Sequence, residues 1–207
     1  MIPIPLTSHT LTRSLLRPAG NMSLVYGDSL VFRLSMITAA ELLASGGTIA
    51  VVDGCNRFDL HAITKYARER KLDPHPLLDR VFVSRGFTCY QMEAAVTTKL
   101  PEFLFRHNGQ TAMIFGLLDT FYDEQVSLQE VQHILQRVLR ALDEMKQKNI
   151  SILLACTEWN VHPKERNMLF DHLKNGMDRI YRLVRDEAEQ PKLFLEEQYP
   201  VQLQKSA

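Results

Sequence analysis

Five short runs of mostly apolar residues recur along the chain, and glycine or polar residues follow them. These runs predict strands at Met22–Tyr26, Thr48–Val52, Val81–Ser84, Thr111–Leu118 and Ile150–Thr157. Their apolar positions are continuous rather than alternating with polar ones. This pattern is typical of strands that are buried on both faces of a parallel sheet.

The segments between these strands have apolar residues three and four apart, as amphipathic helices do. They predict helices from about residue 29 to 45, over Leu60–Arg70, over Thr88–Leu104 and over residues 127–147. The last has the most regular spacing, and Ser127 with Glu130 forms a capping box at its start. Strands and helices that alternate in this way predict an open, mostly parallel α/β sheet with helices on both faces.

The two ends of the chain depart from this alternation. Three prolines near the start indicate that residues 1–21 form an irregular lead-in, which leaves residues 22–207 as a single domain. Short strands at Arg179–Val184 and Leu193–Leu195, separated by a polar turn, predict a closing antiparallel hairpin.

Composition narrows the class of protein. The chain has 207 residues, 24 basic and 24 acidic side chains and 45% hydrophobic residues, which indicates a folded domain with a substantial core. A net charge of zero excludes a globally basic nucleic-acid binder but not a local basic patch. Three widely spaced cysteines favour a reducing cytoplasm, or the nucleus in a eukaryote. No apolar run approaches the roughly 20 residues of a membrane span and no signal peptide is visible, so we expect no membrane contact.

Open α/β sheets bind ligands beyond the carboxyl ends of their strands, so the residues that follow each predicted strand form the candidate site. After the first strand, Gly27, Asp28 and Ser29 stand where a phosphate-binding loop would begin. A working loop needs further glycines and a lysine to wrap the phosphates. The short acidic turn therefore favours a capped helix start, with a surviving anion site as the alternative.

Three side chains after the second and fourth strands could carry chemistry. Asp53 is either a turn residue or a remnant ligand, and Cys55 is more typical of a small buried hydrophobe than of a nucleophile. Asp119 lies in an acidic segment whose carboxylates could hold Mg²⁺, but a solvated loop and helix cap is the simpler interpretation. The sequence therefore implies neither a metal nor another cofactor.

Basic residues follow the fifth strand. Lys164, Arg166 and Lys174 could form a basic face, and Trp159 could stack on a nucleic-acid base. Acidic residues interrupt this segment, so a surface of mixed charge and a tryptophan packed on the core are the alternatives. These four residues are the candidate contacts to DNA.

The order of these pieces resembles the core domain of the RecA/RadA-type recombinases over nearly the whole chain. The elements that carry the likeness are, in order, SLVYGDS, SGG, TIAVVDGCNRFD, AITKYARERKLDPHPLLDRVFVSRGFTCYQM, TAMIFGLLDTFYDE and ISILLACTEW. A helix and a terminal hairpin fit NMLFDHLKNGMDRIYRLVRDEAEQPKLFLEEQYP. The resemblance implies a RecA-like fold in which the segment after the fifth strand is a DNA-contacting loop.

The catalytic groups of that family are missing at the matching positions. The phosphate loop has lost its lysine and threonine, and Cys55 stands where the resemblance places the glutamate that activates water. Gly116 stands where it places the aspartate that holds magnesium through water, and Asp119 lies three residues further on. The resemblance thus implies an inactive relative of RecA-type ATPases with a degenerate nucleotide site.

Three hypotheses for function follow. The leading one is a non-catalytic accessory protein in DNA recombination or repair, which docks on a RecA-type recombinase or another repair protein and binds DNA weakly. The second is a protein-interaction regulator unrelated to DNA, an inhibitor or adaptor on a RecA-like fold. The third is an enzyme that has put Asp53, Cys55 and Asp119 to another use.

Overall fold

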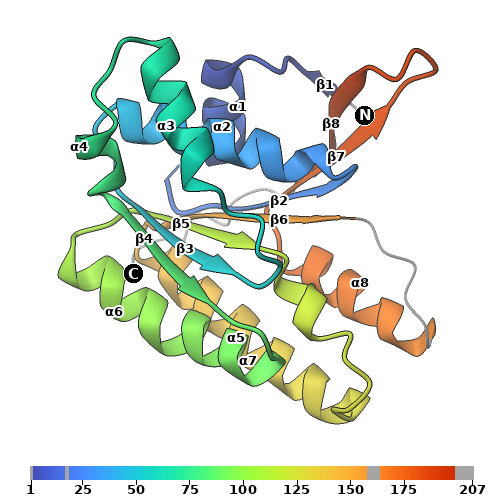
Figure 1. Cartoon of the computed structure of the whole chain (residues 1–207). Coiled ribbons are helices and arrows are strands. Elements are labelled where there is room, and N and C mark those ends of the chain that lie inside the picture. The colour runs from blue at the N-terminus through green and yellow to red at the C-terminus, as the bar shows by residue number, and fades with distance from the viewer. Residues whose placement is uncertain (1, 17–18, 158–163, 199–207) are drawn as a thin grey trace, which may run out of the picture.

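The computed structural model describes residues 2–16, 19–157 and 164–198 (Figure 1). One sheet of eight strands runs through these residues in the order β1-β8-β7-β2-β6-β5-β3-β4. The strands are β1 (Ile2–Ile4), β2 (Met22–Gly27), β3 (Ile49–Asp53), β4 (Val81–Arg85), β5 (Thr111–Phe115), β6 (Ser151–Thr157), β7 (Arg179–Arg185) and β8 (Pro191–Gln198). Strands β2 to β7 pair parallel, whereas β8 pairs antiparallel with β7 and β1. The predicted α/β class, with its mostly parallel sheet and C-terminal antiparallel hairpin, is confirmed.

Helices cover both faces of this sheet. One face carries α1 (Ser8–Leu16), α2 (Leu30–Ala44), α3 (Leu60–Glu69) and α4 (His75–Leu78). The other carries α5 (Cys89–Ala94), the π-helical turn η1 (Ala95–Lys99), α6 (Leu100–Arg106), α7 (Leu128–Gln147) and α8 (Met168–Asn175). The 3-10 turn η2 (Leu117–Thr120) follows β5, and a second 3-10 turn, η3 (Lys164–Asn167), precedes α8. None of the helices in the described ranges has both the length and the apolar character that crossing a membrane requires.

The central strands are apolar at successive positions because they face a separate core on each side. In β6, Leu154 belongs to the core under α5 to α8, and its neighbours Leu153 and Ala155 belong to the core under α1 to α3. Neighbouring side chains of a strand point to opposite faces, so both must be apolar when helices cover both faces. The predicted helix over residues 127–147 is confirmed as α7, which buries Val131, Ile134, Leu135, Val138, Leu142 and Met145.

The prediction of an irregular lead-in over residues 1–21 is wrong. Residues 2–4 form the edge strand β1, and residues 8–16 form α1. Leu11 and Leu15 of α1 are fully buried in the core that α2 also covers. The Tyr181 hydroxyl donates a hydrogen bond to Ser14 O at 2.7 Å and ties α1 to β7. Proline is compatible with an edge strand, so β1 accommodates Pro3, and α1 begins beyond Pro5.

The fourth predicted strand, which is β5 in the structure, is shorter than the sequence predicts. The predicted strand Thr111–Leu118 ends at Phe115, because Gly116 turns the backbone into the left-handed region with φ 58° and ψ 44°. The apolar residues Leu117 and Leu118 continue as η2 and remain buried. This turn determines the geometry of the candidate site.

Because α1 is part of the core, Leu15→Ala should destabilise the protein by about 2–5 kcal/mol, the usual cost of the transfer term and the cavity. Urea denaturation of the full chain measures this change. Arg13→Ala, at an exposed position of the same helix, is the control and should change stability by less than about 0.5 kcal/mol. Equal effects of the two substitutions would show that α1 is not part of the core.

Candidate functional site

The candidate residues after β3 and β5 come together at the carboxyl edge of the sheet. The connection from β3 leads to α3 on one face, and the connection from β5 leads to α7 on the other. Such a point, where neighbouring strands continue to opposite faces, is where open α/β sheets bind ligands. A Cβ atom built on Gly116 would lie 2.6 Å from Cys55 Sγ and 3.1 Å from Asp119 Cγ, so these three residues are in contact.

Asp53 organises the loop that follows β3. Its carboxylate is almost fully buried and accepts hydrogen bonds from the backbone N–H groups of Cys55, Arg57 and Phe58 at 3.3, 3.2 and 3.1 Å. Arg85 Nε, on the neighbouring strand β4, lies 3.7 Å from Asp53 Oδ2. Both carboxylate oxygens therefore face donors of the protein itself. Of the two interpretations of Asp53, the geometry favours the turn residue over the remnant ligand.

Cys55 is held as a neutral thiol. Its Sγ atom lies 3.7 Å from Asp53 Oδ1 and is placed to donate a weak hydrogen bond to it. Burial, reinforced by the negative charges of Asp119 and Asp53, raises the pKa of the thiol far above its usual value. Only the thiolate is a strong nucleophile, so this environment favours the prediction of a small hydrophobe.

Gly116 and Cys55 depend on each other sterically. A Cβ atom at position 116 would lie 2.4 Å from Cys55 Cβ, a distance that real side chains do not reach. The Cys55 side chain thus fills the space that an aspartate at position 116 would need. Cys55 and Gly116, which both differ from the recombinase pattern, therefore form a single packing arrangement.

One carboxylate oxygen of Asp119 differs from those of Asp53 in its surroundings. Among the described residues, Asp119 Oδ1 is buried and has no hydrogen-bond partner, and the same is true of the Thr120 and Thr157 hydroxyls. Burial raises the pKa of Asp119 to about 6, although the positive charge of Arg57 opposes this shift. The described ranges contain no group of three or more His, Cys, Asp or Glu residues arranged to hold a metal ion.

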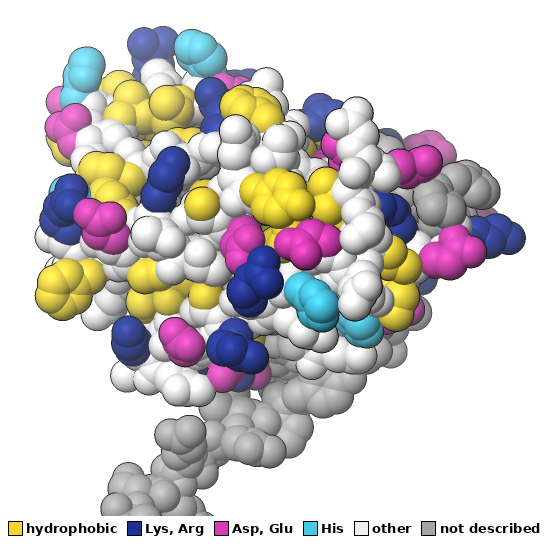
Figure 2. Space-filling model, turned by 90° about the horizontal axis from the view of Figure 1, so that it is seen from below, with side chains coloured by type: hydrophobic (Ala, Val, Ile, Leu, Met, Phe, Trp, Pro, Cys, Tyr) yellow, Lys and Arg dark blue, Asp and Glu magenta, His cyan; other side chains and the backbone are white. Residues whose placement is uncertain are grey.

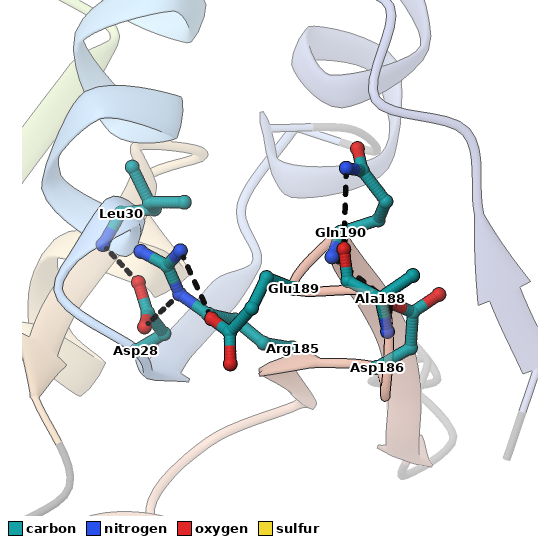
Figure 3. A network of polar contacts seen from close by, with 7 residues as sticks. All are labelled: Asp28, Leu30, Arg185, Asp186, Ala188, Glu189 and Gln190. Atoms are coloured by element: carbon teal, nitrogen blue, oxygen red, sulfur yellow. Dashed lines mark hydrogen bonds and ion pairs between the residues drawn. The ribbon is translucent and has the colours of Figure 1, made fainter.

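An ion pair closes the turn at the end of β2 (Figure 3). Asp28 Oδ1 accepts a hydrogen bond from Leu30 N at 2.9 Å, and Asp28 Oδ2 accepts one from Arg185 Nε at 2.8 Å. The hydrogen bond from Arg185 is the main reason that the pKa of Asp28 lies below its usual value. Ser29 makes no side-chain capping bond. A carboxylate of the protein therefore lies at the start of α2, where a bound anion would otherwise benefit from the helix dipole.

Gly27 is required by the close approach of β7 to this turn. Its φ is 122°, and an added Cβ atom would lie 2.2 Å from Leu183 O. Asp28 N donates a hydrogen bond to the same carbonyl at 3.0 Å. The close packing of β2 against β7 is therefore enough to explain why position 27, which resembles the start of a phosphate loop, is a glycine.

The three candidate DNA contacts that the structure describes, Lys164, Arg166 and Lys174, do not form one exposed basic face. Trp159 lies outside the described residues. Arg166 is only 4% exposed and donates hydrogen bonds to Phe121 O and Val126 O, so the expectation that it is exposed to DNA is wrong. Lys174 Nζ lies 3.3 Å from Glu196 Oε2, and Lys164 is exposed.

The sequence pattern does not reveal Arg185 or Arg57 as parts of this edge. Arg185 is 157 positions from Asp28, so no local spacing connects the two. Arg57 has an electrostatic effect on Asp119 from a loop that follows a different strand. Arg185 directly follows the predicted strand Arg179–Val184 and belongs to the predicted polar turn, where a basic residue needs no further explanation.

Comparison with known proteins adds no relative to this picture. No protein-family model matches the chain, and no curated protein matches its sequence.

Gly116→Ala should destabilise the protein by about 1–3 kcal/mol more than Gly46→Ala, the typical cost of overpacking. Both glycines have positive φ, at 58° and 93°, but the nearest atom to a Cβ at Gly46 is 4.0 Å away. The comparison therefore separates the contact with Cys55 from backbone strain. In the double variant, Cys55→Gly should recover part of the stability that Gly116→Ala loses. Additive effects of the two substitutions on stability would contradict steric coupling.

Asp119→Asn should remove a pH-dependent cost of folding. The folded-state pKa of about 6 exceeds the ordinary value of 3.8, so the folded protein binds this proton more tightly than the unfolded chain. Protonation of Asp119 therefore stabilises the folded protein fully below about pH 3.8, and this stabilisation is lost as the pH rises through about 6. Urea midpoints from about pH 4 to about pH 7 should fall for the native chain relative to the variant. A difference that is constant with pH would contradict this assignment.

Proposed function

We propose that this protein is a non-catalytic, RecA-like accessory protein of DNA recombination or repair, which docks on a RecA-type recombinase through the open edge of its sheet. The RecA-like part of the proposal is supported by the ordered likeness in sequence. A mostly parallel sheet with helices on both faces and a closing hairpin is compatible with it. The docking part is supported by the exposed surface around β4.

Contacts within the protein argue against phosphoryl transfer at the strand ends. The start of α2 is capped by Asp28, which is paired with Arg185. Cys55 fills the space beside Gly116, where the resemblance places the magnesium-holding aspartate. At these two positions of the described structure, an internal ion pair and a cysteine side chain take the places of the phosphate and of the metal-holding aspartate, and phosphoryl transfer depends almost entirely on such positioning. This arrangement favours an interaction protein over an enzyme.

The open edge of the sheet is the observation that carries the proposal. β4 is the last strand of the sheet, and among the described residues no strand pairs with its outer side. Val83 in β4 is 40% exposed, and beyond the strand Phe87 is 73% exposed and Tyr90 is 51% exposed. An unpaired edge offers backbone donors and acceptors to an added strand, while neighbouring aromatic side chains provide specificity.

Contacts within the protein hold β4 and the turn after it in a defined position, in which they could pair with an added strand. On the side of β4 that faces α6, the Phe82 ring lies 3.8 Å from the Phe103 ring and 4.6 Å from the His107 ring, measured between centroids. Gln91 Oε1 accepts a hydrogen bond from Phe87 N at 2.8 Å and fixes the turn that follows the strand. Figure 2 shows hydrophobic side chains at several places between charged groups over the face that carries α5 to α7. Rigid binding surfaces reduce the entropy lost on association.

DNA binding has a smaller part in this proposal. Of the basic candidates, Arg166 is buried and Lys174 is paired with Glu196, which leaves Lys164 exposed. Each phosphate contact requires a basic group without acidic neighbours, and the net charge of the chain is zero. We therefore expect contact with DNA, where it occurs, to be weak and to be reduced by Lys164→Glu.

Purified RecA-type recombinase from the source organism should bind the full chain, and the double substitution Phe87→Ala with Tyr90→Ala should weaken binding at least about tenfold, or about 1.4 kcal/mol. Biolayer interferometry measures this change. Ile2→Ala is the matched control, because Ile2 is 63% exposed on the edge strand at the opposite side of the sheet. Melting temperatures verify that each variant is folded.

Three outcomes would count against the proposal. A recombinase that does not bind, or that binds the edge variant and the native chain equally, would remove the docking function. Saturable ATP binding near the micromolar range, about 8 kcal/mol, would contradict the inactive nucleotide site. Tight DNA binding that falls steeply with salt and needs no recombinase would make the protein a DNA-binding protein instead.

A further inference from the structure

We propose that the groove between α2 and α3 binds an acidic amphipathic helix of a partner protein. This groove lies over the face of the sheet that carries α1 to α4, and it does not involve β4 or the aromatic residues beyond it. The inference therefore does not depend on docking to a recombinase.

The shape of the groove fits an elongated ligand. It has a volume of about 840 Å³ and is lined along α2 from Ser29 to Ala40 and along α3 from Asp59 to Arg70. At about 1.5 Å of rise per residue, each stretch of twelve residues is roughly 17 Å long. This length corresponds to about three turns of a third helix lying along the other two.

The floor of the groove is apolar. Phe32, Met36 and Ala40 come from successive turns of α2, and Tyr66 comes from α3. These four side chains are almost fully buried, so the apolar surface open to a ligand comes from the half-buried Leu6, Ile37 and Ala62, which line the same groove. Residues three and four apart on a docked helix would meet such a floor with their apolar side chains.

Three guanidinium groups lie at the rim of the groove. The Arg57 guanidinium carbon lies 5.8 Å from the centre of the Phe32 ring, and that of Arg70 lies 3.6 Å from the centre of the Tyr66 ring. Arg33 lines the same groove. Within the described residues, no hydrogen bond or ion pair involves these three guanidinium groups. A guanidinium over an aromatic ring keeps its N–H groups available to a carboxylate, which it binds with two parallel hydrogen bonds.

The acidic side chains of the groove are already paired. Asp59 accepts a hydrogen bond from His61 N at 2.8 Å and caps α3. Glu69 lies 3.9 Å from Lys65 Nζ. Glu41 and Asp119 act electrostatically on Arg70 and Arg57 from outside the groove. Within the groove, the four basic side chains of Arg33, Arg57, Lys65 and Arg70 outnumber the two acidic ones, which favours a ligand that carries carboxylates beside apolar side chains.

Single-stranded nucleic acid would also offer negative charge, but the groove does not suit it. Bases need exposed aromatic faces on which to stack. Phe32 is 6% exposed and Tyr66 is 7% exposed, and guanidinium groups lie over both rings. The observations therefore favour a peptide helix.

Three fluorescent helical peptides of about 14 residues test the proposal. They share a leucine stripe at helical spacing and carry Glu, Gln or Lys along both flanks. Fluorescence anisotropy with the full chain, up to millimolar protein, should show that the Glu peptide binds at least tenfold more tightly than the other two. Failure of the Glu peptide to bind, or equal binding of the Glu and Gln peptides, would overturn the proposal.

Charge-reversal variants locate the binding site. The triple variant Arg33→Glu, Arg57→Glu and Arg70→Glu should lose at least tenfold in affinity for the Glu peptide. The matched control reverses three exposed basic residues elsewhere, Arg13, Arg140 and Lys148, and should bind like the native chain. Equal loss in both triple variants would indicate nonspecific charge attraction and overturn the proposal.

Single substitutions guard against misfolding of the triple variant. Each of Arg33→Gln, Arg57→Gln and Arg70→Gln should weaken binding about threefold or more while the melting temperature stays near that of the native chain. An oligothymidylate that displaces the Glu peptide from the groove would identify nucleic acid as the ligand and overturn the helix assignment. Recombinase binding should be unchanged in all these variants, so this proposal and the edge-docking function fail separately.

Discussion

The rest of the structure depends on the burial of the central strands on both of their faces. Because β2, β6, β5 and β3 are covered by helices above and below, nearly every side chain on them is apolar. Polar chemistry is consequently confined to the ends of the strands and to the outer surfaces of the helices. This constraint brings Asp28, Asp53 and Asp119 to one edge, and partly exposed side chains occur on strands toward the sides of the sheet, such as β4.

At that edge, the protein satisfies its polar groups with its own residues. The Asp53 carboxylate is saturated by backbone N–H groups, and Asp28 is bound to Arg185 and to the start of α2. Asp119 is the contrasting case, because one of its oxygens stays buried without a partner in the described structure. A carboxylate left in this state favours its neutral form, which explains its higher pKa. Two of the three carboxylates at this edge are therefore held by internal hydrogen bonds, and Asp119 keeps an oxygen that no described residue contacts with a hydrogen bond.

Elements that obey one local rule could be predicted from the sequence, and those that depend on distant residues could not. The central parallel strands follow from continuous apolar runs, and α7 follows from helical periodicity. α1 is less evident because prolines flank a short helix whose burial comes from packing against α2 and β7. Arg166 looks like a surface residue in sequence, yet it donates to carbonyl groups of the loop that precedes α7. Cys55 and Gly116 were separately notable, but their mutual dependence appears only when β3 and β5 lie side by side.

The pairing of β1 with β8 has a consequence for the order in which the chain can fold. Ile2 pairs with Leu195 and Ile4 pairs with Leu193, so β1 is synthesised before every other strand of this sheet but finds its partner last. During synthesis on the ribosome, β2 to β6 can assemble while β1 waits for β7 and β8 to emerge. Contacts between residues so far apart in sequence form slowly, because a long loop must close before they are made. The two outermost strands beyond β7 should therefore complete the sheet after its parallel part has formed.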